Sequence, residues 1–290
     1  MQEIVPGIFV ETTYPPYNLA LISLDEGALL VNAPPRPSHA EAWLIQAQEH
    51  AHPLRYLVLT DAAPERLIGA AACDMPIIAG ETTLRILARK TDREWHELTQ
   101  AMAHRYPDEA AAINNLKQPQ VTLACDEALT LYHRTPPLRF VELPGTTPGA
   151  IAIKVEEHQV LFTGDVVTID APLPLEYAVD SKAWLNLLGD LAFDTDIQRI
   201  APGRGQAVIL RGEIEQVREF LRVMRRISRT LERSAEEIGY KKHAQDLGQA
   251  FYNRGGQQAV KWIQRGLKRL VEEIILSQAR EEGESEESPD

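Results

Sequence analysis

The stretch that decides the fold is LTDAAPERLIG, residues 59–69. It follows a nearly continuous apolar run over residues 54–60, and such a run is typical of a strand that is covered on both faces. A short helix is expected from about Glu65, and a second apolar run follows at residues 75–79. A helix between two buried strands predicts α/β layering, with Asp61, Glu65 and Arg66 just after the first strand.

Strand-like segments occur in two blocks, one on each side of a helical stretch. The first block contains apolar segments at residues 4–10, 19–23 and 28–31, and the second covers residues 120–163. Residues 81–117 between them have a helical pattern. The sequence therefore predicts an α/β (α+β) protein in which residues 1–211 form two sheets packed together with helices outside, a four-layer αββα sandwich.

The pattern changes at residue 212, and residues 212–279 are predicted to be a helical C-terminal extension packed on this domain. An arginine stripe lies along one face of its first helix, at Arg218, Arg222, Arg225, Arg229 and Arg233. A solvated helix face is the simplest interpretation of the stripe, and a surface for a partner or nucleic acid is the alternative. The apolar stripe from Val260 to Ile274 is compatible with a homodimer, and the acidic residues 280–290 are predicted to be a disordered tail.

Composition excludes several classes of protein. The 290 residues are 44% hydrophobic and carry a net charge of −12, which is ordinary globular composition and disfavours nonspecific binding to nucleic acid or anionic lipid. Cys73 and Cys125 are the only cysteines, so no disulfide framework is indicated. Neither a secretion signal nor an apolar run of about 18 residues is present, which predicts a cytoplasmic protein without a membrane span.

Three further segments extend the pattern of residues 59–69. They are LPGTTPG at 143–149, LFTGD at 161–165 and APGRG at 201–205. In order, spacing and context the four segments resemble the framework motifs of the metallo-β-lactamase superfamily, whose glyoxalase-II-like members commonly add C-terminal helices. The resemblance implies the αββα fold and, in active members, two divalent ions held by five histidines and two aspartates.

The histidines of that metal centre are absent from this sequence. Matched motif by motif, the ligand positions other than the bridging aspartate hold Asp61, Ala63, Glu65, Arg66, Thr146 and Arg204. Asp165 stands at the position of the metal-bridging aspartate, and Asn32 stands where the family often has a structural aspartate. A zinc site of this type needs neutral imidazoles, whereas arginine is cationic and has no lone pair to donate. The zinc expected for the family therefore lacks its ligands, and we assign no cofactor, no metal ligand and no catalytic residue.

The leading hypothesis is thus a pseudoenzyme that binds a small ligand or acts as a scaffold. Its candidate site residues, as ligand contacts or as an ion cluster, are Asp61, Glu65, Arg66, Thr146, Asp165 and Arg204. The two arginines suit a small anionic or ester-like ligand. Each residue also has a structural interpretation: Asp165 as a brace of its turn, Asp61 as a helix N-cap, and Glu65 as a first-turn carboxylate.

Two alternatives remain open. In the first, Asp61, Glu65 and Asp165 supply oxygen ligands to Mg²⁺ or Mn²⁺ in a divergent hydrolase. In the second, the basic C-terminal helices make the protein an interaction or nucleic-acid-binding module. Charge compensation separates the leading hypothesis from the first alternative, because it predicts that Arg66 or Arg204 forms an ion pair with Asp165 or Glu65.

Overall fold

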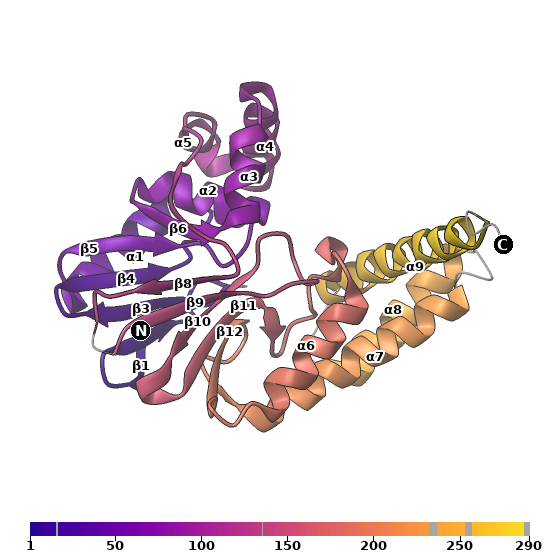
Figure 1. The fold of residues 1–290 in the computed structure, drawn as a ribbon. Helices are drawn as coiled ribbons and strands as arrows, with labels where there is room; N and C mark the ends of the chain where they lie inside the picture. Colours follow the sequence, from indigo (N-terminus) through magenta and orange to yellow (C-terminus); the bar gives the residue numbers. More distant parts are fainter. Residues whose placement is uncertain (16, 135, 232–236, 253–256, 287–290) are drawn as a thin grey trace.

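The structure, a computed structural model, describes residues 1–15, 17–134, 136–231, 237–252 and 257–286. Two β-sheets lie face to face between two groups of helices (Figure 1). This arrangement confirms the predicted αββα sandwich.

The first sheet has seven strands in chain order: β1 (Gln2–Val5), β2 (Ile8–Glu11), β3 (Leu19–Leu24), β4 (Gly27–Val31), β5 (Leu54–Val58), β6 (Ile77–Gly80) and β7 (Val121–Cys125). Strands β1 to β4 form an antiparallel meander, and β4 to β7 pair in parallel. Parallel neighbours require crossover connections, which helices supply here. The LTDAAPERLIG stretch is therefore the crossover that leaves β5 for β6.

The second sheet has six strands in the order β13-β12-β11-β10-β9-β8. Their bounds are β8 (Ala128–Leu131), β9 (Leu138–Glu142), β10 (Ile151–Val155), β11 (Val160–Thr168), β12 (Arg199–Arg204) and β13 (Ile209–Leu210). Strands β11 and β12 pair in parallel, the other neighbours in this sheet pair antiparallel, and every residue of β11 is buried. Asp165 therefore lies inside a strand that continues to Thr168, whereas the sequence places it directly after a strand.

Helices lie on the outer side of each sheet, and those on the second side continue beyond it as a bundle (Figure 1). On the first sheet these are α1 (Pro37–His50), α2 (Pro64–Cys73), α3 (Glu81–Arg89), α4 (Asp92–Arg105) and α5 (Ala110–Asn114). On the second side these are α6 (Ser181–Phe193), α7 (Ile214–Leu231), α8 (Glu237–Phe251) and α9 (Gln257–Glu286), with the short 3-10 helix η3 (Leu175–Tyr177) against α9. Within the described residues, no helix is both long and apolar enough to cross a bilayer.

Three apolar layers hold these four layers together. Alternate residues of a strand belong to different apolar layers. Leu21 packs under the helices of the first sheet, whereas Ile22 packs between the two sheets. The third layer joins the second sheet to α6, α7, α8 and α9, and it includes Trp184, Phe220 and Leu267. The C-terminal extension thus shares a hydrophobic core with the sandwich.

Two local expectations need correction. The predicted strand at residues 4–10 is divided into β1 and β2 because Gly7 takes a positive φ of 73°, a turn conformation that glycine adopts readily. The predicted disordered tail is helical as far as Glu286, since α9 continues through it. Glutamate favours helix, and extending an existing helix requires no new nucleation. Residues 287–290 of the tail lie outside the described residues.

Candidate functional site

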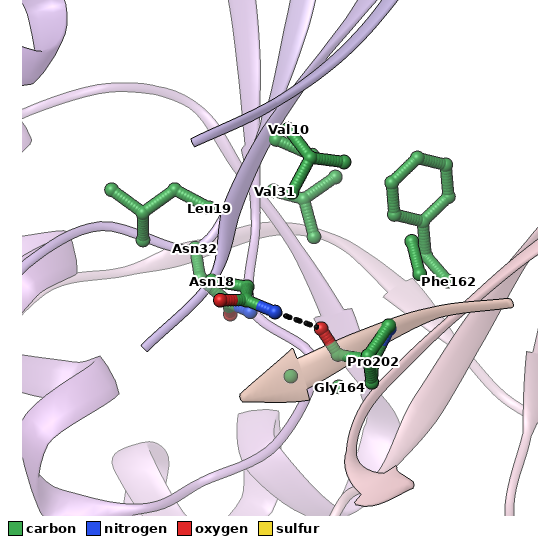
Figure 2. A pocket seen from close by; sticks show the side chains of 11 residues that line it. Val10, Asn18, Leu19, Val31, Asn32, Phe162, Gly164 and Pro202 are labelled. Atoms are coloured by element: carbon green, nitrogen blue, oxygen red, sulfur yellow. Dashed lines mark hydrogen bonds between the residues drawn. The ribbon is translucent and has the colours of Figure 1, made fainter. Parts of the chain in front are cut away.

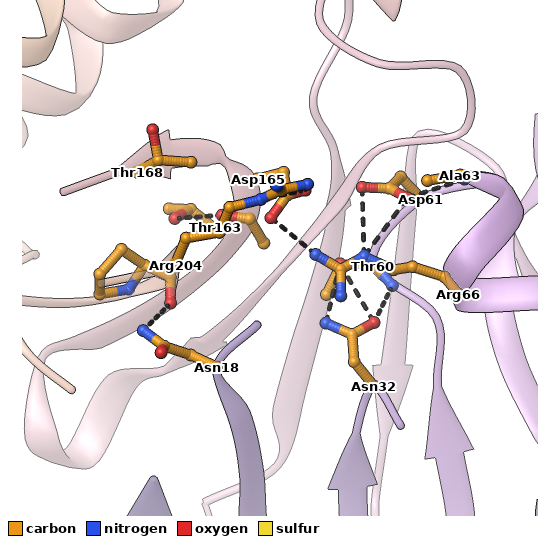
Figure 3. A network of polar contacts seen from close by, with 12 residues as sticks. Asn18, Asn32, Thr60, Asp61, Ala63, Arg66, Thr163, Asp165, Thr168 and Arg204 are labelled. Carbon is orange, nitrogen blue, oxygen red and sulfur yellow. Dashed lines mark hydrogen bonds and ion pairs between the residues drawn. The ribbon is translucent and has the colours of Figure 1, made fainter. Parts of the chain in front are cut away.

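Four of the predicted site residues meet where the two sheets face each other (Figure 3). Asp61 lies on the loop after β5, and Arg66 lies in the first turns of α2. Asp165 comes from β11 and Arg204 ends β12 in the other sheet. All four side chains are buried, with exposed fractions of 1%, 1%, 2% and 7% in that order. The cluster therefore joins the two halves of the sandwich.

Two guanidinium groups divide the carboxylate of Asp165 between them. Arg66 Nη2 donates to Asp165 Oδ1 at 2.7 Å. Arg204 donates to Asp165 Oδ2 through Nε at 3.0 Å and through Nη2 at 2.5 Å. Arg66 Nε also lies 3.4 Å from Asp61, whose Oδ1 accepts the backbone N–H of Ala63 at 2.9 Å. The ion pair that charge compensation predicts is present, and both arginines form it.

Burial and charge act in opposite directions on these groups. Burial by itself raises the pKa of Asp165, but Arg204 and Arg66 outweigh it and hold that pKa below its ordinary value. At Asp61 burial dominates and raises the pKa, because Arg66 opposes it only in part. Burial also works against the charges of Arg66 and Arg204, yet Asp165 raises the pKa of each. Asp165 is thus the anion around which the cluster is organised.

Two backbone features hold the strand ends in place around the cluster. Asn32, at the position of the family's structural aspartate, has a φ of 59°, and its Oδ1 accepts the backbone N–H of Thr60 at 3.1 Å. This bond fixes the strand end that leads to Asp61. Across the site, a Cβ on Gly203 would lie 2.4 Å from Asp165 Oδ1, so only glycine lets β12 approach β11 here.

Aromatic rings cover the guanidinium groups. Arg66 and Arg204 lie over the ring of Tyr17, at 5.4 and 5.0 Å from its centroid, and Arg204 also lies 4.9 Å from the ring of Trp262. Such contacts stabilise a desolvated cation. No motif in the sequence marks Tyr17 or Trp262, because each reaches the site from a distant segment.

Two predicted members do not join the cluster. Glu65 pairs instead with Arg105 of α4, whose Nη1 is 2.6 Å from Glu65 Oε1. Thr146 is fully buried, but its hydroxyl donates to the carbonyl of Leu143 at 2.7 Å and so closes its own turn. Both residues lie where the motifs place them, yet each has a partner that the sequence does not reveal.

A pocket of about 240 Å³ opens above the cluster. Its lining combines charged and aromatic side chains from both halves of the sandwich and from α9: Glu65, Arg105, Pro174, Glu176, Tyr177, Arg204, Gln258, Trp262 and Arg265. Arg204 thus belongs to both the cluster and the pocket. Motif positions identify Glu65 and Arg204, whereas the other lining residues carry no recognisable signal in the sequence.

A second, smaller space lies between the sheets beside the cluster (Figure 2). Val10 and Val31 line it from one sheet and Phe162 from the other, and Asn18 Nδ2 donates to the carbonyl of Pro202 at 3.0 Å. Its volume of about 10 Å³ is enough for roughly one water molecule. The pocket above the cluster is therefore the ligand-sized space at this site.

The protein is similar to known proteins in its structure. No family model matches the sequence, and no curated protein matches it. A metallo-beta-lactamase family protein from Thermus thermophilus superposes with a TM-score of 0.64 and 17% identity over 97% of this chain and 95% of that chain. The DIM-1 metallo-beta-lactamase gives 0.59 and 15% over 77% and 96%.

The chain has the metallo-β-lactamase fold. The sec-alkylsulfatase Pisa1 from Pseudomonas sp. also matches, with a TM-score of 0.63 and 14% identity over 93% of this chain and 49% of that chain. The fold expected from the four motifs is thus confirmed. At these identities the likeness concerns the fold alone, so activity must be inferred from the site itself.

The residues of this site do not fit the zinc centre typical of the metallo-β-lactamase fold. Both oxygens of Asp165 are engaged by guanidinium groups, and Arg66 and Arg204 offer hydrogen-bond donors where a metal needs lone pairs. In the part of the chain that the structure describes, no group of three His, Cys, Asp or Glu side chains is arranged to hold a metal ion. Glu65 is directed to Arg105, so the three carboxylates of the hard-metal alternative do not converge.

The arginine stripe of α7 is largely paired within the protein. Arg218 and Arg222 contact Glu215, at 3.1 and 2.6 Å. Arg225 lies 3.4 Å from Glu273 of α9. Arg229 is exposed, and Arg233 lies outside the described residues. Because three of its arginines already form ion pairs within the protein, the stripe is a weaker candidate for binding nucleic acid than the sequence suggests. That alternative stays a prediction.

Proposed function

We propose that this protein is a non-hydrolytic member of the metallo-β-lactamase fold, which binds a small ligand with an anionic group in the pocket above the cluster. One observation carries the proposal: the guanidinium groups of Arg66 and Arg204 occupy both oxygens of the residue that bridges metals in the active family. Positive charge at this site is therefore supplied by the protein.

The chemistry of the cluster argues against hydrolysis by the family's route. That route needs a water whose pKa is lowered by a metal, and the cluster offers no imidazole, while both oxygens of Asp165 are engaged by arginines. Arginine at its high pKa cannot act as a general base. Asp165 is already an acceptor from two cations, and its low pKa makes it a poor base as well.

The hydrogen-bond donors of the pocket favour an anionic group on the ligand. Three cations line it, Arg105, Arg204 and Arg265, against two carboxylates. Arginine binds carboxylate and phosphate well because its planar fork donates two parallel hydrogen bonds. Trp262 and Tyr177 add aromatic walls, so an aromatic carboxylate has the right combination of properties.

The first test concerns turnover. Wild type and Asp165→Ala are assayed on a lactam, a thioester, a lactone and a phosphodiester with Zn²⁺, Mg²⁺ or Mn²⁺. We expect the two proteins to give equal, background rates. Metal-dependent turnover that Asp165→Ala abolishes would contradict the proposal and favour the carboxylate-ligand hydrolase.

The second test concerns binding. Calorimetric titration of the full chain with 3-phenylpropionate is expected to show saturable binding that Arg105→Gln weakens. Arg93→Gln is the matched control, because Arg93 is on the same helix but its side chain is 88% exposed and outside the pocket. Equal affinity of the wild type and both variants for 3-phenylpropionate would show that its carboxylate does not bind in this pocket.

A further inference from the structure

One wall of the pocket holds a buried carboxylate oxygen without a hydrogen bond. Glu176 lies in η3, and its side chain is only 19% exposed. Within the described residues no donor reaches its Oε2, which is fully buried. Arg265 Nη1 lies 3.7 Å from this oxygen, beyond hydrogen-bond distance. A buried acceptor left unpaired is unfavourable, and Glu176 is one of the residues that line the pocket.

The burial of Glu176 also makes its ionised form unfavourable without a partner. Burial raises the pKa of Glu176, and Arg265 lowers it less than burial raises it. A cationic or N–H donor placed against this carboxyl would favour its ionised form. Glu176 is therefore suited to accept a hydrogen bond from a donor group of a ligand.

Two arginines of the same lining offer donors without a full set of acceptors. Arg204 uses Nε and Nη2 for Asp165, and its Nη1 makes no hydrogen bond in the described part of the chain. Arg105 is 40% exposed and contacts Glu65 through Nη1. The carboxylate of a ligand in the pocket would accept hydrogen bonds from these guanidinium groups.

The charges around the pocket balance before any ligand binds. Four carboxylates and four guanidinium groups form three separate sets of ion pairs: Asp61 and Asp165 with Arg66 and Arg204, Glu65 with Arg105, and Glu176 with Arg265. A ligand of one sign would add an uncompensated charge to this half-buried set, whereas a ligand with both signs would not. The volume of about 240 Å³ lies just below the range of about 300 to 1,000 Å³ for drug-sized ligands, so the ligand is small.

Aromatic side chains define the remaining walls. Trp262 lies over Arg204, and Tyr177 lies beside Glu176 in η3. Burial raises the pKa of Tyr177 to about 12, so its hydroxyl remains a donor at neutral pH. Flat apolar groups pack well against such rings.

We propose that the pocket recognises a small amphoteric molecule of the aromatic amino-acid class, with its ammonium group on Glu176 and its carboxylate on Arg204 and Arg105. This inference rests on the proposed function, because it assigns the ligand class of the same pocket. It adds one requirement that an anion site does not have, namely a donor for Glu176.

Three matched probes test the requirement by calorimetric titration of the full chain: L-phenylalanine, 3-phenylpropionate and 2-phenylethylamine. They carry both charges, only the anion and only the cation on the same ring. We expect L-phenylalanine to bind at least about tenfold more tightly than either of the other probes, since only it can pair with both Glu176 and the two arginines. This comparison needs no variant protein.

Variants then test whether the ammonium group of the ligand contacts Glu176. Glu176→Gln should reduce the affinity for L-phenylalanine to about that for 3-phenylpropionate, while the affinity for 3-phenylpropionate stays the same or rises. Glu272→Gln is the control, because Glu272 lies on α9 with a side chain that is 67% exposed and outside the pocket. Thermal unfolding of each variant checks that it is folded.

The outcomes separate the two proposals. If 3-phenylpropionate binds as tightly as L-phenylalanine and Glu176→Gln changes neither affinity, the amphoteric ligand is wrong and the anion-binding function stands. If 2-phenylethylamine alone binds, or none of the probes binds, both proposals are overturned. Tighter binding of L-phenylalanine that persists in Glu176→Gln would also contradict the inference, because the ammonium group would then lie elsewhere.

Discussion

At the scale of single residues, the site is a set of buried charges that compensate one another. Motif positions were sufficient to predict that Arg66 or Arg204 pairs with Asp165, because the removal of metal cations leaves negative charge that must be neutralised. They were not sufficient for Glu65, whose partner Arg105 comes from α4. That contact depends on how α4 packs beside α2, which local sequence does not encode.

The first prediction concerns the ion pairs of Asp165. Arg66→Ala and Arg204→Ala should each lower the free energy of unfolding by about 3 to 5 kcal/mol, because each leaves a buried carboxylate short of a partner. Urea denaturation measures this change. Arg93→Ala removes an exposed helix pair with Glu97 and should change stability by at most about 0.5 kcal/mol. A loss of similar size in all three variants would show that the cluster is no stronger than a surface pair.

The second prediction concerns acid. Because the folded pKa of Asp165 is lowered, its stabilising contribution is present above its unfolded pKa of about 4 and is lost as pH falls through the folded value. Wild type should therefore lose more stability between about pH 6 and pH 3 than Asp165→Asn does. The folded pKa of Asp61 is raised, so its contribution has the opposite sign and Asp61→Asn should lose more than wild type.

Urea unfolding at several pH values between these limits gives the comparison. The slopes of stability against pH matter here, since the substitutions also change stability at neutral pH. Three parallel curves would mean that neither carboxyl has a shifted pKa in the folded protein.

At the scale of elements, β11 and β12 form the rigid base of the site. Their close parallel approach depends on Gly203, where an added Cβ would lie 2.4 Å from the backbone carbon of Gly164 as well as from Asp165 Oδ1. The approach was not predictable from propensity, because the residues of APGRG would equally suit a surface turn. Only the order and spacing of the four motifs indicated that this segment belongs to the site.

Substitution of this glycine is the third prediction. Gly203→Ala should reduce stability by about 1 to 3 kcal/mol, since the backbone of β11 must move to admit a methyl group. Gly212→Ala is the control, because no atom lies within 4 Å of the Cβ it would add, and its effect should stay within about 0.5 kcal/mol. Thermal or urea unfolding compares the two. Equal stabilities would show that β12 has room for a methyl group beside β11.

Element boundaries reveal where local sequence was insufficient. Ser38 and Glu41 have capping-box spacing, yet α1 begins at Pro37 without a side-chain cap, and Ser38 contacts Glu109 instead. Residue 109 is 71 positions away in the chain, so its competition with the local cap is a tertiary effect. The strand β5 and the first part of β11 were identified because their apolar runs do not depend on such partners.

At the scale of the whole molecule, the C-terminal helices complete the site. Leu267 and Leu270 of α9 are buried in the core shared with the second sheet, and Trp262 on the same helix covers Arg204. The sequence predicts the apolar stripe of this helix but not the surface that it meets, because a stripe is equally suited to a dimer. Its residues pack against the protein's own core.

The central claim is that guanidinium groups take the place of metal ions at this site. Elemental analysis of the full chain, purified without chelator, tests it most directly, with Asp165→Ala measured alongside. We expect less than about 0.1 equivalent of zinc, manganese or iron per chain in both proteins. One or two equivalents of metal per chain in wild type, lost in Asp165→Ala, would contradict the claim.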